Sequence, residues 1–301
     1  MSAPTTATVD LGKSRCRLLA QDESRVDARV ERSGVGAPGL AAAGGVDAAL
    51  GAILPLLDGL DDLTDLGVGA AGAWLAPAAA AELATALASR TGARVAVASD
   101  VVTAHAGALD GAPGVLLIAG TGAAALGIDR DGARLIDGWG PELGDLGSGS
   151  WLGREALRAL LRAADGLGEP TALTAALAAP VGSAAEVQAW LAGDGPLARR
   201  LATLAPLVLD TAAQGDAVAQ VIVAEGVRLL TATARAASAV TEDVVLHGGL
   251  VDHPWFSEAL TSSLEAAGRR VVPARGDALA GALLLTRRLD LPHERFVHRA
   301  E

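Results

Sequence analysis

The sequence predicts an α/β fold made of two lobes, each built around a mixed β-sheet. Its 301 residues suit one large domain or, more often, two lobes. Strand patterns alternate with helix patterns along most of the chain, which favours an α/β architecture. Two widely separated segments also begin alike, with a strand, a glycine turn and a second strand. This likeness suggests that the two lobes arose by an ancient duplication.

The first lobe is expected to span residues 1–103 and to open with a β-hairpin over 6–22 that turns at Gly12. The pattern then predicts strands over 25–34, 65–74 and 93–100, and helices over 46–57 and 78–90. We also expect a C-terminal helix over 286–301 to join this lobe.

The second lobe is expected to span 104–285. A short helix follows Asp100, and "GVLLIAGTGAAALGIDRDGARLID" (114–137) predicts a second hairpin and a further strand, joined by an Asp-Gly turn. A largely helical insertion follows over 149–236, with its longest helix at 217–237. The remaining predicted elements are strands at 244–247 and 270–272, helices at 255–267 and 277–288, and a polar tail.

Composition excludes several classes of protein. A net charge of −11 argues against a nucleic-acid partner. No uncharged apolar run reaches the ~18 residues of a membrane span, and the N-terminus lacks the pattern of a signal peptide. Cys16, the single cysteine, cannot form an internal disulfide, a thiolate zinc site or an iron–sulfur cluster by itself. We therefore expect a cytoplasmic protein in which Cys16 is an inert strand residue.

Three turns in which a strand runs into glycines are candidates for phosphate contacts: "VDLGKS" (9–14), "IAGTGAAALG" (118–127) and "VVLHGGL" (244–250). Glycine lets backbone N–H groups approach phosphate oxygens closely. A single such turn is ordinary hairpin geometry, but three of them, with Asp10 in the first, favour nucleotide binding. Neither a P-loop nor a dinucleotide-binding fingerprint is present.

Carboxylates at two other places are further candidates for a functional site. Asp100 follows a strand, where it could cap the next helix or accept a hydroxyl proton. The stretch "GWGPELGDLGSGSWLGREALRALL" (138–161) places Asp145 and Trp139 among glycines before an amphipathic helix. Asp145 could cap that helix or bind a ligand through its two acceptor oxygens, and Trp139 could pack or contact a ligand. The helix would bury a stripe formed by Leu152, Ala156, Leu157, Leu160 and Leu161.

Taken in order, these motifs resemble the actin-like ATPase superfamily and, within it, the BadF/BadG-type ATPase family, above all its N-acetylglucosamine kinases. "ASDVVTAHAGA" (98–108) and "GDALAGALLL" (276–285) belong to the same resemblance, which covers essentially the whole chain. It implies two duplicated ribonuclease-H-like lobes around a central cleft that binds ATP, Mg²⁺ and a sugar.

The resemblance also implies a role for each candidate residue. Asp10 would hold Mg²⁺ through water, and Asp100 would be the catalytic base and contact the sugar. Three turns would bind ATP: Gly12, Lys13 and Ser14 at the β- and γ-phosphates, Gly120, Thr121 and Gly122 as the second phosphate turn, and Gly248 and Gly249 at the adenosine. The sugar would lie against Gly138, Trp139, Gly140 and Asp145.

Three positions depart from the family pattern. The first phosphate turn is one residue tighter than usual and its threonine is shifted or lost, although Lys13 could compensate as a phosphate cation. Gly39 stands where the family often has a sugar-contacting asparagine, and Ser99 where an asparagine often precedes the catalytic aspartate. The glycine leaves sugars other than N-acetylglucosamine open.

The resemblance therefore implies an ATP-dependent kinase that phosphorylates a hydroxyl, the 6-hydroxyl by analogy, of N-acetylglucosamine or a related amino sugar. Glucosamine, N-acetylmuramic acid and glucose remain alternative substrates. A homodimer is expected, without nucleic-acid or membrane partners. Two other classes stay in view: a non-catalytic sugar sensor, and an ATPase that activates a dehydratase, although a single cysteine does not fit the bridging cluster of such activators.

Overall fold

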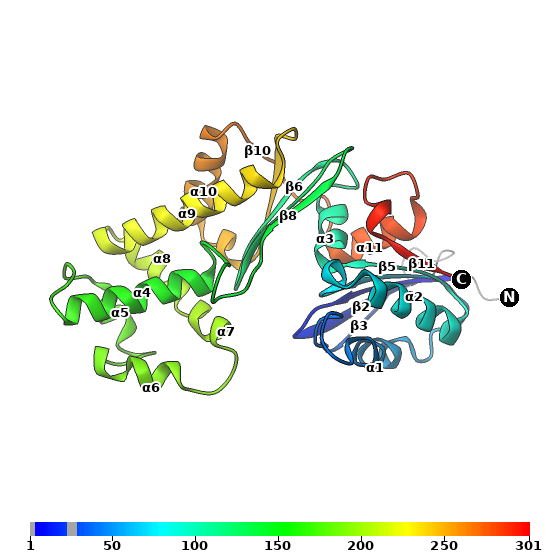
Figure 1. The fold of residues 1–301 in the computed structure, drawn as a ribbon, viewed down its shortest axis with the longest axis horizontal. Helices are drawn as coiled ribbons and strands as arrows, with labels where there is room; N and C mark the ends of the chain where they lie inside the picture. Colours follow the sequence, from blue (N-terminus) through cyan, green and yellow to red (C-terminus); the bar gives the residue numbers. More distant parts are fainter. Residues whose placement is uncertain (1–3, 23–28) are drawn as a thin grey trace. The chain divides into compact units, whose positions relative to one another are not determined.

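The structure, a computed structural model, describes residues 4–22 and 29–301, and it divides into two compact units. Unit 1 comprises Met1–Pro113 and Pro273–Glu301, and unit 2 comprises Gly114–Val272. The fold class is the predicted one, α/β with two mixed sheets (Figure 1).

Unit 1 is built on a six-stranded sheet in the order β11-β5-β4-β1-β2-β3. Strands β1, β4 and β5 run parallel, whereas β2, β3 and β11 are each antiparallel to a neighbour. The strands are β1 (Thr5–Leu11), β2 (Arg15–Asp22), β3 (Arg29–Val35), β4 (Leu63–Ala70), β5 (Arg94–Ser99) and β11 (His298–Ala300). Residues 25–28 of the predicted third strand lie outside the described residues.

Helices cover both faces of this sheet, so its central strands are buried on both sides, as parallel strands usually are. Helices α1 (Gly45–Leu57) and α2 (Pro77–Thr91) pack on one face, and α3 (Asp100–Ala108) and α11 (Ala278–Arg287) on the other (Figure 1). Helices α3 and α11 touch backbone to backbone. A Cβ on Gly107 would lie 1.9 Å from the Asp277 carbonyl oxygen, and one on Gly281 1.8 Å from that of Thr103. Only glycine permits this crossing.

Unit 2 contains a five-stranded sheet in the order β10-β9-β6-β7-β8. Its strands are β6 (Gly114–Ala119), β7 (Ala123–Ile128), β8 (Ala133–Asp137), β9 (Asp243–His247) and β10 (Arg270–Val271). Its helices are α4 (Gly149–Ala164), α5 (Leu173–Leu177), α6 (Val187–Leu191), α7 (Leu197–Ala202), α8 (Ala205–Ala213), α9 (Ala217–Ala237) and α10 (Pro254–Ala266). Short 3₁₀ turns occur at Ala73–Leu75 (η1), Ala184–Glu186 (η2), Gly249–Asp252 (η3) and Glu294–Phe296 (η4).

Helix α9 crosses β6, β7 and β8 and forms part of the core of unit 2. Among the described residues it is the one helix long and apolar enough to cross a membrane. Half of its apolar window is buried inside the protein, however, and a core helix passes the same test of length and composition.

The two sheets share one topology. In unit 1, β1-β2-β3 is an antiparallel meander, β4 pairs parallel with β1, and β5 pairs parallel with β4. In unit 2, β6-β7-β8 repeats the meander, and β9 and β10 repeat the two parallel strands. This repetition is the pattern expected from the predicted duplication. Strand β11 is an addition to unit 1.

The division into units differs from the expected boundary at residues 103 and 104. That boundary would cut α3, which stays whole in unit 1 because it packs on β4, β5 and α11. The C-terminal segment also differs, since residues 286–301 do not form a helix. Helix α11 ends at Arg287, and β11 pairs with β5. His293 in this segment is fully buried, so the segment is part of the fold and not a polar tail.

Cys16 is fully buried in β2. Burial, helped by the nearby Asp10 carboxylate, raises the pKa of its thiol to about 11. The thiolate is the reactive form, and it is scarce at neutral pH. The prediction that Cys16 is inert fits this environment.

Candidate active site

In unit 1, the carboxyl ends of two parallel strands bring Asp10 and Asp100 to the same edge of the sheet. Asp10 is the penultimate residue of β1, and Asp100 directly follows β5 as the first residue of α3. Strand β4 lies between them, with Gly69 opposite Asp10 and Ala70 opposite Ser99. This edge is where open α/β sheets bind their ligands.

Asp10 is held by one of its two oxygens. The hairpin register places Arg17 directly across from it. The Asp10 Oδ2 atom accepts from Arg17 Nη2 at 2.8 Å and from Nε at 3.2 Å. Its other oxygen, Oδ1, accepts no hydrogen bond from the residues that the structure describes. Half of this carboxylate therefore remains able to bind something else.

Asp100 shows the same division of its oxygens. Its Oδ1 atom accepts from the Val101 amide at 2.9 Å and from Ser99 Oγ at 3.0 Å. Its Oδ2 atom has no such donor within residues 4–22 and 29–301. Ser99, and not Asp100, is the N-cap residue of α3. The alternative that Asp100 is only a helix cap is thus not what the structure has.

Burial raises the pKa of Asp100, and the two hydrogen bonds to Oδ1 offset this only in part. The charge of Asp10 raises the pKa of Asp100 further, whereas that of Lys13 lowers it. Asp10 and Lys13 are therefore close enough for their charges to act on Asp100. A carboxylate with a raised pKa is a better proton acceptor at neutral pH than an ordinary one.

The first glycine turn forms a cavity of about 400 Å³, lined by Asp10, Gly12, Lys13, Ser14, Arg15 and Arg17. The Gly12 amide donates to the Arg15 carbonyl at 3.0 Å, so the chain reverses at Lys13 and Ser14. The Lys13 amide finds no acceptor in the described part of the chain. An open amide and three cations make this turn suited to an anion.

A glycine from the loop after β3 supports the first turn. A Cβ on Gly36 would lie 2.3 Å from the Gly12 carbonyl oxygen and 2.5 Å from the Arg15 nitrogen. The next residue, Ala37, donates its amide to the Gly12 carbonyl at 3.2 Å. Gly39 in the same loop packs similarly on the segment after β4, where a Cβ would lie 3.2 Å from the Ala71 carbonyl oxygen.

In unit 2, the second glycine turn, Gly120–Gly122, is supported by the start of α4. The Gly149 amide donates to the Gly120 carbonyl at 2.8 Å, and the Ser150 amide to the Thr121 carbonyl at 3.1 Å. The Thr121 and Gly122 amides donate to no acceptor among the described residues. The turn thus presents two open N–H groups.

The third glycine turn lies beside the second. Gly248 adopts a φ of 109°, and a Cβ there would lie 2.6 Å from the Ala119 carbonyl oxygen and 2.9 Å from the Gly120 amide. Gly249 begins η3, directly after this contact. The two turns predicted to bind phosphate and adenosine are therefore adjacent in space.

Asp145 lies against the second turn. Its Oδ1 atom accepts from the Ala123 amide at 3.2 Å, and Oδ2 has no donor among the described residues. A Cβ at position 122 would lie 2.9 Å from the Asp145 Oδ1 atom, so this contact needs Gly122. Burial raises the pKa of Asp145, the Ala123 amide lowers it, and the charge of Asp137 raises it. The helix-cap alternative is wrong, because Ser148 accepts the Trp151 amide instead.

Asp137 is a residue that the sequence analysis missed. It is buried, with a φ of 63°, and both its oxygens are occupied. Oδ1 accepts the Asp145 amide at 2.8 Å, and Oδ2 accepts the Leu146 amide at 2.7 Å. Asp137 thus holds the loop that carries Asp145, and it has no oxygen left for a ligand. The Asp-Gly pair at 137–138, where positive φ is common, was the available signal.

Gly138 and Gly140 also have positive φ, 75° and 90°, and they flank Trp139. The Trp139 side chain is exposed, at 65% of its reference area, so it is not part of the core of unit 2. Arg154 on α4 donates to the Pro141 carbonyl and ties the loop to the helix. The predicted stripe on that helix is confirmed: Leu152, Ala156, Leu157 and Leu160 are buried, and Leu161 packs against the core.

The candidate residues thus fall into two groups, one in each unit. Unit 1 brings together Asp10, Gly12, Lys13, Ser14 and Asp100. Unit 2 brings together Gly120, Thr121, Gly122, Gly138, Trp139, Gly140, Asp145, Gly248 and Gly249. The meeting of Asp100 and Asp145 on one sugar stays a prediction of the family resemblance.

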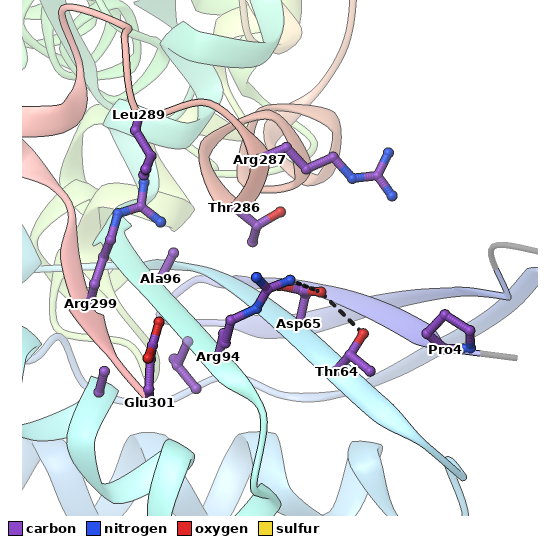
Figure 2. A pocket seen from close by; sticks show the side chains of 12 residues that line it. Pro4, Thr64, Asp65, Arg94, Ala96, Thr286, Arg287, Leu289, Arg299 and Glu301 are labelled. Carbon is purple, nitrogen blue, oxygen red and sulfur yellow. Dashed lines mark hydrogen bonds and ion pairs between the residues drawn. The ribbon is translucent and has the colours of Figure 1, made fainter.

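A larger cavity, of about 580 Å³, lies at the opposite edge of the unit 1 sheet, where β4 and β5 begin. Figure 2 shows Arg94 reaching Asp65 there, and Asp65 also accepts a hydrogen bond from the Thr64 hydroxyl. Its lining contains none of the candidate residues. Cavity size alone would therefore have pointed away from the candidate residues.

Two α/β units with mixed sheets of one topology make this the actin-like ATPase fold. The chain belongs to the BadF/BadG/BcrA/BcrD ATPase family, whose pattern residues 12–286 match.

Several proteins that are similar to this chain carry kinase names. The chain is 33% identical to an N-acetyl-D-glucosamine kinase of Dictyostelium discoideum over 39% of its own length and 38% of that enzyme. It is 26% identical to an N-acetylmuramic acid/N-acetylglucosamine kinase of Clostridium acetobutylicum over 64% of its own length and 67% of that enzyme. A Chromobacterium violaceum crystal structure, provisionally named N-acetylglucosamine kinase, superposes with a TM-score of 0.74 at 29% identity, over 95% of this chain and 100% of that one.

Proposed function

We propose that this protein is an ATP-dependent sugar kinase that transfers the γ-phosphoryl group of ATP to a hydroxyl of N-acetylglucosamine or a related amino sugar. One observation carries the proposal. Asp10 and Asp100 lie at one edge of a sheet, each with one oxygen held by the protein and the other open. Membership of an ATPase family and the names of the relatives support ATP as donor and a sugar as acceptor.

Asp100 is the proposed base. Its open oxygen takes the proton of the acceptor hydroxyl while a bond forms between that hydroxyl oxygen and the γ-phosphorus, and the bond from that phosphorus to the β–γ bridging oxygen breaks. Asp145, with Gly138, Trp139 and Gly140, is proposed to bind the sugar. The open amides of Lys13, Thr121 and Gly122, with Gly12, Ser14 and Gly120, are proposed to bind the phosphates, and Gly248 and Gly249 the adenosine.

Asp10 fits a role in binding Mg²⁺. No cluster of three or more His, Cys, Asp or Glu side chains within the described ranges could hold a metal by itself. Mg²⁺ is typically bound by one or two carboxylates together with substrate phosphates and water. Asp10 lines the cavity of the first turn, and its Oδ1 accepts no hydrogen bond from the described residues, which suits that mode. When bound, the ion would neutralise charge on the transferring phosphoryl group.

The test is ATP consumption by the purified protein with Mg²⁺ and a panel of sugars: N-acetylglucosamine, glucosamine, N-acetylmuramic acid, N-acetylmannosamine and glucose. We expect the amino sugars to give the highest kcat/KM and the product to carry phosphate on O6, which ³¹P NMR would show. Absence of turnover with every sugar would overturn the proposal. The same preparation would test the proposed homodimer by light scattering, and fractionation of the source cells would test the cytoplasmic location.

A further inference from the structure

Arg17 joins two carboxylates that are far apart in the sequence. Its Nη2 and Nε atoms donate to Oδ2 of Asp10, and its Nη1 atom donates to Oδ2 of Asp277 at 3.3 Å. The guanidinium is partly buried, at 36% side-chain exposure, and Asp10 is more buried still, at 23%. Sequence reasoning assigned no role to Arg17 or Asp277.

Asp277 is anchored by its other oxygen. It is the N-cap of α11, and its Oδ1 atom accepts the Leu279 and Ala280 amides, each at 3.1 Å. Helix α11 in turn packs without a gap on α3, which begins with Asp100. Arg17 is therefore attached to a fixed point of the fold, and it attaches Asp10 to the same point.

The attachment is one-sided. Both contacts from Arg17 fall on Oδ2 of Asp10, and the carboxylate cannot rotate without losing them. The direction of Oδ1 is consequently fixed, in a residue that lines the first-turn cavity. Without Arg17, neither oxygen of Asp10 would accept a hydrogen bond from the described residues.

From these contacts we propose that Arg17 is a positioning residue, which restricts Asp10 to one available oxygen and so makes the nucleotide site selective for Mg²⁺ over Ca²⁺. This inference rests on the proposed function, since it requires ATP and a divalent cation at the first turn. Mg²⁺ demands near-ideal octahedral geometry and keeps several waters, whereas Ca²⁺ accepts a carboxylate through both oxygens in a flexible shell. Removal of Arg17, which frees Oδ2 of Asp10, should thus favour binding of Ca²⁺ over Mg²⁺.

The experiment measures the dissociation constant of a non-hydrolysable ATP analogue by calorimetry, with Mg²⁺ and then with Ca²⁺, without sugar. The ratio of the two constants is the readout. Removing the positive charge of Arg17 strengthens the attraction of the site for both divalent cations alike, so this charge effect cancels in the ratio. The ratio therefore reports the geometry of the Asp10 carboxylate. We expect Arg17→Met to lower the preference for Mg²⁺ roughly tenfold, the scale on which residues behind a metal ligand act. Arg17→Lys should lie between.

The matched control is Arg94→Met. Arg94 lies in the same sheet and pairs with Asp65 at 2.8 Å, the distance of the Arg17–Asp10 pair, but at the opposite edge. Its ratio should stay within about twofold of wild type, because neither Arg94 nor Asp65 lines the first-turn cavity. In an Asp10→Asn background, Arg17→Met should change nothing further. If Arg17→Met does not fold, Asp277→Asn, which retains a capping side chain, should still lower the ratio part of the way.

An unchanged ratio in folded Arg17→Met, or an equal change in Arg94→Met, would overturn the positioning role. If Arg17→Met lowers the preference for Mg²⁺ but the wild-type protein phosphorylates no sugar, the proposed kinase function is overturned and the role of Arg17 stays intact. A wild-type protein that binds no ATP analogue would overturn both.

Discussion

The hairpin turns of the two units use the same support but obtain their carboxylates from different places. Each turn has a glycine from another segment against its backbone, Gly36 in unit 1 and Gly248 in unit 2. In unit 1 the acidic residue belongs to the hairpin itself, because Asp10 lies in β1 opposite Arg17. The corresponding pair in unit 2 is Ile118 and Ala124, both uncharged.

Unit 2 obtains its carboxylate from a loop instead. Asp145 reaches the second turn from the segment between β8 and α4, and Asp137 holds that segment in place. The pairing of β1 with β2 places Arg17 beside Asp10 directly, whereas the loop that carries Asp145 is held by the buried Asp137. A shared topology therefore fixes where turns lie, and separate residues decide what charge stands beside them.

The comparison also separates the candidate carboxylates from those with both oxygens occupied within the protein. Asp137, Asp216 and Asp277 use both oxygens within the protein. Asp10, Asp100 and Asp145 each use one, among the described residues. Because an unoccupied carboxylate oxygen in a partly buried site is costly, its presence at three candidate positions favours a role for it.

The largest expected effect separates Asp100 from Asp145. Asp100→Asn should lower kcat by ~10²–10⁴-fold, the usual contribution of a general base, with sugar binding retained. Asp145→Asn should instead act mainly on the KM for sugar. Steady-state kinetics on both variants checks this, and a kcat loss of the same size in both would remove the proposed division between a proton acceptor and a sugar-binding carboxylate.

Asp100→Asn should also be more stable than wild type at neutral pH. Burial raises the pKa of Asp100 in the folded protein, so the ionised form destabilises the fold, and this effect grows as the pH rises above the ordinary value of 3.8. A neutral amide removes the effect and can still accept from Val101 and Ser99. Thermal unfolding at pH 5 and pH 8 should show a larger gain at pH 8. A loss of stability at pH 8 would contradict the assignment.

Next in size are the two supporting glycines. Gly36→Ala and Gly248→Ala each force a Cβ into backbone atoms, at 2.3 Å and 2.6 Å, and should cost about 1–3 kcal/mol of stability together with weaker binding of ATP. Gly51→Ala in α1, where a Cβ meets nothing within 4 Å, is the control and should stabilise by up to ~1 kcal/mol. If either supporting variant binds ATP as wild type does, its turn does not contact the nucleotide.

Unit 1 also contains a buried pair of histidines. His105 Nδ1 and His293 Nε2 are 2.8 Å apart, and both rings are fully buried. Burial, with the neighbouring His105, lowers the pKa of His293 to about 3. Its neutral form is thus favoured by folding, and the stability it gives is complete above pH 6.5 and is lost as the pH falls towards 3.

We therefore expect acid to open unit 1 before unit 2. Between pH 6.5 and pH 4 the loss should approach ~1.4 kcal/mol per pH unit at most, and His293→Gln should flatten this dependence. Hydrogen exchange resolved by unit checks it. Loss of protection in unit 2 first, or an unchanged pH dependence in His293→Gln, would contradict it.

The smallest expected effect distinguishes the turns by charge. Lys13 in the first turn lowers the pKa of Asp100, and Thr121 in the second turn carries no charge. Lys13→Met should move the acidic limb of the kcat/KM profile upward by a few tenths of a pH unit. Thr121→Ala keeps the open amide and changes no charge, so it should leave that limb in place. Measuring the pH dependence of kcat/KM for the two variants side by side tests this difference. An upward shift of the acidic limb in both variants would contradict the role given to the charge of Lys13.

Local sequence patterns determined much of this protein. Strand alternation, glycine turns and helix periodicity predicted most elements, and the longest helix, Ala217–Ala237, was predicted to the residue. These features depend on neighbours along the chain, so the sequence carries them directly. The order of motifs likewise indicated the family.

The tertiary structure decided what depends on contacts between distant segments. The apolar periodicity of the sequence could not show that residues 286–301 end in an edge strand and a buried histidine, since three residues of β11 carry almost no pattern of their own. Nor could it show that Arg17 meets Asp277, 260 residues away, or that Asp137 spends both oxygens on a loop. Which oxygen of a carboxylate stays free is set by donors from other elements, and only the folded chain brings those donors together.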